Sequence, residues 1–472
     1  MIAVLAAAAV AISGGALSSF APVRGAFRAA LALLFGLGIW SVAYAVALFA
    51  FGADPRVRLA KDALLVVAGT VVLVRRPGRA PLAGDPGAPR SSSEVPRWPA
   101  YAVAAAAVLA TAFFVEHTLR HPDGGWDAWA IWNLRARFLA RGGDGFRAAF
   151  SPEILFWAHQ DYPLLVPGAV AQAFLLARSE SPWVPAAVSY AFAAAAVALL
   201  GAAARETRGA GWGALAALAL LSTPCFVGFA SNQQADVALG ALLLAACALT
   251  AIALESGQAR ALLPAGFAAS LAAWTKNEGA LYLTCLAAAL LATRWGPPRQ
   301  RVRGLLRFGL GALPVLALVA WFKLRIAHES DLFGHASASR ILDASRWGEL
   351  LAAIPRRIVY FQDWGLWLVG EIAVLAILLP RLPRRPAARA MGMAIALALA
   401  VTMAVYVLQP HPLLWFFRAS IDRVLIQLWP SALLATVLAL APQPGGRGSP
   451  SSGAGLDAAG ASPSPQTRAN DR

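Results

Sequence analysis

The sequence has little charge for its length. Only 14% of its 472 residues are Asp, Glu, Lys or Arg, whereas soluble domains carry about 25%. Lysine is especially scarce, and Lys61, Lys276 and Lys323 are its three examples. Hydrophobic residues make up 59% of the chain. A composition this poor in charge and this rich in apolar residues excludes a soluble globular domain.

Cysteine is scarce as well. Cys225, Cys247 and Cys285 all fall within apolar runs, so we interpret them as packing residues and not as a disulfide framework. The formal net charge of +16 suggests nucleic acid as one class of partner. The arginines sit between apolar runs, as loop anchors do, and we therefore reject a nucleic-acid partner. No basic stretch precedes the apolar residues 2–20, which favours a first span over a cleaved signal peptide.

Long apolar runs dominate what remains. Many of them supply the ~20 residues needed to cross about 30 Å of hydrocarbon. The backbone of such a run must satisfy its own hydrogen bonds, so these runs should be helices, and the alternating pattern of a membrane β-barrel is absent. We predict an all-α polytopic membrane protein with about 11–13 transmembrane helices. Spans are expected near residues 2–20, 29–51, 60–74, 99–117, 183–203, 211–229, 234–254, 261–274, 279–293, 305–326, 364–380, 390–408 and 424–441.

Arginine in the short loops predicts the orientation. Loops 75–98, 294–304 and 381–389 are rich in Arg and should face the cytoplasm. The loop with Arg56, Arg58 and Lys61 falls on the outer side and violates the rule. The long connection 118–182 then faces outward. We divide the chain into N-terminal transmembrane segments with a cytoplasmic loop (1–98), a transmembrane core (99–442) and a disordered cytoplasmic tail (443–472).

The start of the long outer connection combines aromatic and acidic residues. Three tryptophans recur at a spacing of three, which predicts an interfacial helix with Trp126, Trp129 and Trp132 on one face. Asp127 follows Gly124 and Gly125 and lies among these rings. It is either part of a simple membrane anchor or a carboxylate placed to act as a general base.

Another polar element follows in the same connection. His159, Asp161, Tyr162 and Pro163 precede the apolar residues 166–177, which are too few to cross a membrane. We expect a re-entrant or interfacial helix with Pro163 in its first turn and Asp161 near its positive end. A plain helix start is the alternative.

Ionisable residues also lie at the outer ends of later spans. Asp236 opens an apolar run, where helix N-capping is the alternative to a functional role. Lys276 and Glu278 separate two short spans and are costly at membrane depth unless they are paired or face a polar cavity. Arg423 precedes the last span. It either clamps a phosphate or pairs with its neighbour Asp422.

Four motifs recur in one order on one predicted side. They are Asp127 in the first long outer loop, Tyr162-Pro163-Leu164, Asp236 in the segment 235–239, and Thr275-Lys276-Asn277-Glu278-Gly279. Over roughly residues 99–300 this arrangement resembles the membrane glycosyltransferases of the type C fold. That group includes the dolichyl-phosphate-mannose protein mannosyltransferases and the lipid A aminoarabinose transferases.

The resemblance implies an enzyme that uses a polyprenyl-phosphate-linked sugar as its donor. Asp127 and Asp236 are then expected to be catalytic, with Asp127 as the base on the acceptor. Substrate binding is expected to fall to Asp161, Tyr162, Lys276, Glu278 and Arg423. The chemistry is consistent, because a departing phosphate needs a cation and an acceptor hydroxyl needs a base.

We therefore expect an inverting hexosyl or pentosyl transferase at the outer face of a bacterial inner membrane. Its partners would be membrane lipids and the polyprenyl-phosphate sugar, and its acceptor a lipid, a glycan or a protein. Cofactors stay unknown; a divalent metal, if one is required, is expected near Asp127, Asp236 or His159. A secondary transporter or flippase is the main alternative, although no internal repeat is evident. A lipid-linked polymerase or ligase is a further one.

Overall fold

The computed structural model describes residues 2–75, 98–151, 153–154, 158–327, 337–359 and 385–440. Within these ranges the regular elements are helices, and no strand occurs. The first half of the chain forms α1 (Ile2–Ser18), α2 (Gly25–Phe51), α3 (Pro55–Arg75), α4 (Trp98–Arg120), η1 (Ala128–Trp132), α5 (Asn133–Arg141), η2 (Gly143–Phe150), α6 (Leu165–Ala177), α7 (Trp183–Arg208), α8 (Ala210–Leu221) and α9 (Pro224–Ser231). The second half forms α10 (Ala235–Ser256), η4 (Ala259–Ala261), α11 (Leu262–Ala273), α12 (Asn277–Ala292), α13 (Pro298–Arg325), η5 (Ala338–Leu342), α14 (Ala344–Val359), α16 (Pro386–Leu408) and α17 (Leu413–Leu440).

The polytopic helical fold is confirmed. In the described part of the chain, seven helices are long and apolar enough to cross a membrane, namely α2, α4, α7, α10, α13, α16 and α17. The bent pair α8 and α9, which meet at 61°, brings the number to eight if it forms one span. The predicted spans near 261–274 and 279–293 are the shorter helices α11 and α12. The predicted span 364–380 and the tail 443–472 lie outside the described residues.

A buried polar network accounts for Lys61, one of the three charges that violated the predicted orientation. Lys61 lies inside α3 and is buried, so it is not a loop charge. Its ammonium group is 2.6 Å from the Asp62 carboxylate and also donates to Gln172 of α6. The Trp40 indole of α2 donates to Asp62 at 3.0 Å. Since a buried charge must be paired, this network fixes α3 against α2 and α6.

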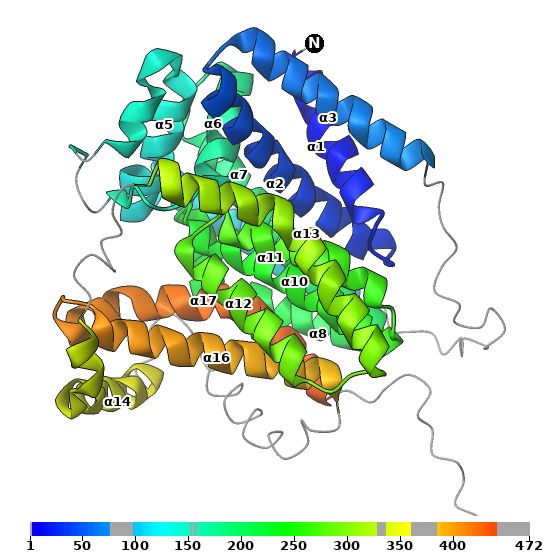
Figure 1. Cartoon of the computed structure of the whole chain (residues 1–472), viewed down its shortest axis with the longest axis vertical. Coiled ribbons are helices and arrows are strands. Elements are labelled where there is room, and N and C mark those ends of the chain that lie inside the picture. Colours follow the sequence, from blue (N-terminus) through cyan, green and yellow to red (C-terminus); the bar gives the residue numbers. More distant parts are fainter. Residues whose placement is uncertain are drawn as a thin grey trace, which may run out of the picture.

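Helix α10 forms the centre of the bundle. It is apolar on all sides, as expected for a fully enclosed helix, and it packs against α7, α11 and α17. Its 22 residues extend about 33 Å, with Asp236 at one end and Gly257 at the other. Figure 1 shows the long helices lying side by side and running obliquely, with α5 and α14 at the left-hand end.

The turn between the short helices α11 and α12 lies at the Asp236 end of α10. They pack against each other and are joined by residues 274–276. A Cβ atom on Gly279 would lie 1.9 Å from the Ala272 carbonyl oxygen, so only glycine permits this close packing. The glycine that ends the Thr-Lys-Asn-Glu-Gly motif therefore sets the position of Lys276.

Candidate active site

Asp236 is the buried centre of a cluster of charged side chains. The carboxylate has no exposed surface, and it accepts hydrogen bonds from the Lys276 ammonium group at 2.9 Å and from the Gln427 side-chain amide. The Nε atom of Arg423 lies 3.4 Å away. The N-cap of α10 is Gln234, so the N-capping alternative for Asp236 is wrong. A buried carboxylate needs such partners, and this one holds two cations in place.

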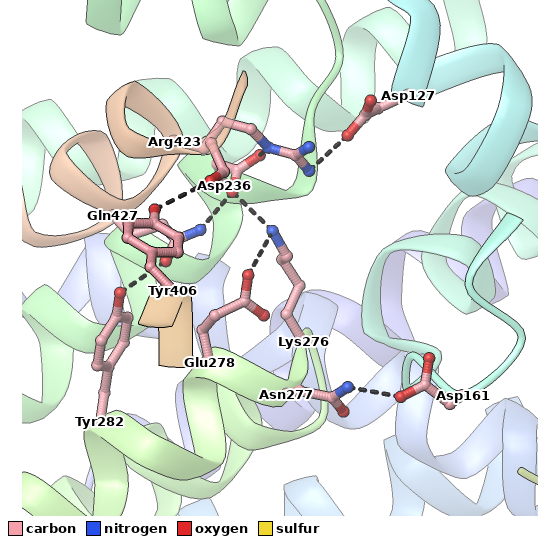
Figure 2. Close-up of polar contacts among 11 residues, drawn as sticks. Asp127, Asp161, Asp236, Lys276, Asn277, Glu278, Tyr282, Tyr406, Arg423 and Gln427 are labelled. Atoms are coloured by element: carbon pink, nitrogen blue, oxygen red, sulfur yellow. Dashed lines mark hydrogen bonds and ion pairs between the residues drawn. The ribbon is translucent and has the colours of Figure 1, made fainter. Parts of the chain in front are cut away.

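Arg423 joins two carboxylates that are far apart in the sequence. Its guanidinium forms an ion pair with Asp127 and also approaches Asp236, and Figure 2 shows it between the two acids. The sequence predicted that Arg423 precedes the last span, but the residue lies inside α17. The Asp127 and Arg423 side chains are 13% and 22% exposed. Glu278 is 26% exposed, so these three side chains are the parts of the cluster that a ligand can reach.

Lys276 projects from the turn between α11 and α12 into the same cluster. Its side chain is almost fully buried, and its ammonium group lies 2.9 Å from Asp236 and 3.0 Å from Glu278. The ammonium group also lies 5.5 Å from the ring centroid of Tyr162, within range of a cation–π contact. The Lys–Glu pair considered from the sequence is present. It is not private, because Asp236 shares the lysine.

The loop that contains Asp161 is attached to this cluster by side chains from three helices. The Asp161 carboxylate accepts from the Asn277 amide at 2.6 Å and from Lys323 at 3.2 Å. The buried guanidinium of Arg135 donates to the Tyr162 carbonyl oxygen at 2.6 Å. Helix α6 begins at Leu165, so the prediction that Pro163 lies in its first turn is wrong. Asp161 connects its loop to α12 and α13 and does not act at the N-terminus of α6.

Stacked rings form the wall beside Lys276. Trp132 stacks on Tyr162 at 5.5 Å between centroids with planes 6° apart, and His159 stacks on the same tyrosine at 4.7 Å and 15°. Trp132 is fully buried, whereas Trp126 and Trp129 are exposed. The predicted common face for the three tryptophans is therefore wrong. The reason is the π-helical turn η1, because wider turns break the 3.6-residue spacing and often occur at functional sites.

Burial fixes the protonation of the two ring side chains in this loop. It lowers the pKa of His159 and raises the pKa of Tyr162 well above its ordinary value. Near neutral pH the imidazole is therefore neutral and the phenol keeps its proton. His159 also has a positive φ of 45°, which is uncommon for a residue other than glycine and typical of functional loops.

The residues present do not fit a metal site. Within the described ranges, no group of three or more His, Cys, Asp and Glu side chains could hold a metal ion. Asp127 and Asp236 both face Arg423, and His159 stacks on Tyr162. We therefore assign no metal-dependent step.

Several polar residues of the cluster were missed from the sequence. Gln427 is fully buried in α17, donates to Asp236 and accepts from the Tyr282 hydroxyl at 2.8 Å. The signal was available, because an amide inside an apolar span is costly unless it has a partner. Some buried polar atoms beside the cluster have no hydrogen-bond partner among the described residues: Trp132 Nε1, Trp274 Nε1, Asn277 Oδ1 and Glu278 Oε2. Such atoms are suited to hold water or a ligand.

The fold and the cluster define a polytopic helical membrane protein with a cluster of buried charged residues at one end of its central helix. Residues 161–322 match the family model described as dolichyl-phosphate-mannose-protein mannosyltransferase. This match confirms the resemblance to the membrane glycosyltransferases for the part of the chain that contains Asp161, Asp236 and Lys276. Asp127 and Arg423 lie outside the matched residues.

One solved structure is similar at low identity. It is a crystal structure of ArnT from Cupriavidus metallidurans bound to undecaprenyl phosphate, with 18% sequence identity and a TM-score of 0.44. The similarity covers 72% of this chain but only 60% of ArnT. No curated protein matches the chain.

Proposed function

We propose that this chain is a glycosyltransferase that moves a sugar from a polyprenyl-phosphate donor to a lipid, glycan or protein acceptor. The observation that carries the proposal is the placement of Arg423, which pairs with the partly exposed Asp127 and with Asp236, the buried partner of Lys276. Two cations for a phosphate thus lie beside a reachable carboxylate. The match of residues 161–322 to the mannosyltransferase family supports the same activity.

The charges also indicate where the donor binds. Arg423 and Lys276 are both neutralised by carboxylates in the free protein. An incoming phosphate must displace one of these acids. Arg423 is paired with Asp127, whose side chain is 13% exposed, and with Asp236, which is fully buried. The phosphate therefore takes the place of Asp127 on the guanidinium fork of Arg423. The same exchange leaves the Asp127 carboxylate free.

The freed carboxylate supplies the base for transfer. Asp127 accepts the proton of the acceptor hydroxyl while that oxygen attacks the anomeric carbon of the sugar. The bond from the anomeric carbon to the phosphate oxygen breaks, and Arg423 and Lys276 stabilise the departing phosphate. A single displacement of this kind inverts the anomeric centre. Asp236 acts as a positioning residue, because it holds both cations.

Tyr162, Asp161 and Glu278 complete the binding site in this proposal. The Tyr162 ring faces Lys276 and lines the path of the sugar. Asp161 keeps the loop attached to α12 and α13. Glu278 has a buried carboxylate oxygen without a hydrogen-bond partner among the residues that the structure describes, and a sugar or acceptor hydroxyl is the natural donor to it.

We place this site on the periplasmic side of a bacterial inner membrane. The Arg-rich segment 294–304, which comprises the end of the turn after α12 and the start of α13, lies at the far end of α10 from Asp236, and Arg-rich segments of this kind face the cytoplasm. A polyprenyl chain stays within the bilayer, so an enzyme that uses it must be embedded there as this chain is.

The test is a reaction in proteoliposomes with a panel of polyprenyl-phosphate sugars. We expect the protein to release free polyprenyl phosphate from one donor when the acceptor-bearing lipids or glycans of the source cell are present. Asp127→Asn protein of equal thermal stability should not release it. A donor that crosses the bilayer with its sugar still attached, and without release of polyprenyl phosphate, would identify a flippase and overturn the proposal.

A further inference from the structure

A cavity lined by arginines lies at the opposite end of α10 from Asp236. It has a volume of about 510 Å³ and is lined by residues from the turn after α10 and from the first turns of α13. Four of its lining residues are arginines, at Arg260, Arg299, Arg303 and Arg307, and no Asp or Glu is among the described residues that line it. The cavity thus has the chemistry of an anion site.

The arginines of α13 gather although their charges repel. Arg299, Arg303 and Arg307 follow one another at four-residue steps and so share one helix face. Like charges at this spacing destabilise a helix. In the described part of the chain none of the three forms a salt bridge with a carboxylate. An anion from outside the chain would therefore remove this repulsion.

An apolar stripe runs beside the arginine row on the same helix. Val302, Leu306, Leu310 and Leu313 are all more than half exposed and recur at steps of four, four and three. Helix α13 is a candidate membrane span, so this stripe faces acyl chains. The arginine row begins at the helix start and ends within its first three turns, at the depth of lipid head groups.

We infer that this cavity binds an anionic phospholipid of the cytoplasmic leaflet. Its phosphate lies among Arg260, Arg299, Arg303 and Arg307, and its acyl chains follow Leu310 and Leu313, the part of the stripe beyond the arginine row. Basic pockets between transmembrane helices on this side of a membrane are suited to such head groups. A free phosphate would satisfy the arginines but leave the stripe unused. A phospholipid satisfies both with one molecule.

The test measures lipid retention by the full chain. Protein delipidated in neutral detergent is mixed with phosphatidylglycerol and phosphatidylcholine of identical acyl chains, and bound lipid is counted by native mass spectrometry. We expect roughly tenfold preference for phosphatidylglycerol. Arg303→Gln and Arg307→Gln should each lower its retention about fivefold, which corresponds to about 1 kcal/mol for each basic residue. Arg303→Lys keeps the charge and should retain most of the binding.

The matched control is Arg294→Gln, which removes the same charge from the connection just before α13 but does not line the cavity. It should bind phosphatidylglycerol like the parent protein. Equal retention of the two lipids would overturn the inference, as would an equal loss in Arg294→Gln and Arg303→Gln, which would indicate general charge attraction. Displacement of phosphatidylglycerol by inorganic phosphate alone, or by equimolar polyprenyl phosphate, would assign the cavity to those ligands instead.

Discussion

Asp127 and the donor phosphate compete for Arg423 in the proposed reaction. Asp127→Asn keeps the shape of the side chain and removes its negative charge. Arg423 is then less neutralised before the donor arrives, although it still lies 3.4 Å from Asp236. We therefore expect this single change to strengthen donor binding while it abolishes transfer. If Asp127 only bound substrate, or only formed a structural ion pair with Arg423, the variant would not combine stronger donor binding with loss of transfer.

The exposure of the pair limits the size of the binding effect. The Asp127 and Arg423 side chains are 13% and 22% exposed, and partly solvated ion pairs contribute up to about 1 kcal/mol. Polyprenyl phosphate should therefore bind up to about fivefold more tightly to the variant. Transfer should fall at least ~100-fold, because the general base is lost. Thermal stability should change little, because Arg423 keeps its second carboxylate.

The assay combines titration of polyprenyl phosphate into protein in nanodiscs with a melting curve and a turnover measurement. Asp123→Asn is the matched control, since Asp123 lies in the same loop and pairs with Arg137 at 3.5 Å. It should change neither affinity nor turnover. Weaker phosphate binding by Asp127→Asn together with a lower melting temperature would show a structural ion pair. Normal turnover by that variant would refute its role as the base.

Three further predictions concern stability, topology and pH. Lys276→Met should cost about 3–5 kcal/mol because Asp236 loses a buried partner, and adding Asp236→Asn should restore part of this loss in a double-mutant cycle; strictly additive losses would contradict the pairing. The three native cysteines are buried, so in intact spheroplasts an impermeant thiol reagent should label Ser151→Cys and not Pro298→Cys; the reverse pattern would overturn the topology. Burial lowers the pKa of His159 from its ordinary 6.5. As the pH falls below about 6.5, the unfolded chain therefore takes up this proton before the folded chain does, and the folded protein loses stability. Asparagine tolerates the positive φ at this position, so the melting temperature of His159→Asn should fall less than that of the parent between pH 7 and pH 5.5. An equal fall would show that His159 does not cause the loss of stability.

The order of helices could be predicted from the sequence because an apolar run of about 20 residues forms a transmembrane helix. Both short helices around Lys276 appear where the pattern predicted them. Asp127 in the long outer loop, and Asp236 and Arg423 at span ends, were selected as charges on one predicted side. The structure brings them into contact, although their roles stay predictions. Topology alone can predict such a gathering, because it assigns each span end to one face.

The contact partners of these residues could not be predicted from the sequence. Arg423 could pair with its neighbour Asp422 or with any acid on the same face, and only the packing of α17 against α10 selects Asp236. Trp132 was misplaced because a π-helical turn has no recognised sequence signature, so the 3.6-residue spacing was assumed. Lys61 was taken for a loop charge because its partner Gln172 lies in another helix. Each error concerns a contact between distant segments.

Glycan and glycolipid profiling of a deletion strain of the source organism tests the central proposal most directly. If the chain is a polyprenyl-phosphate-dependent glycosyltransferase, the deletion should remove one sugar from a lipid, glycan or protein and should accumulate the unmodified acceptor. The parent gene should restore the sugar, and an Asp127→Asn gene that gives the same amount of folded protein should not. An unchanged profile in the deletion strain, or full restoration by Asp127→Asn, would contradict the proposal.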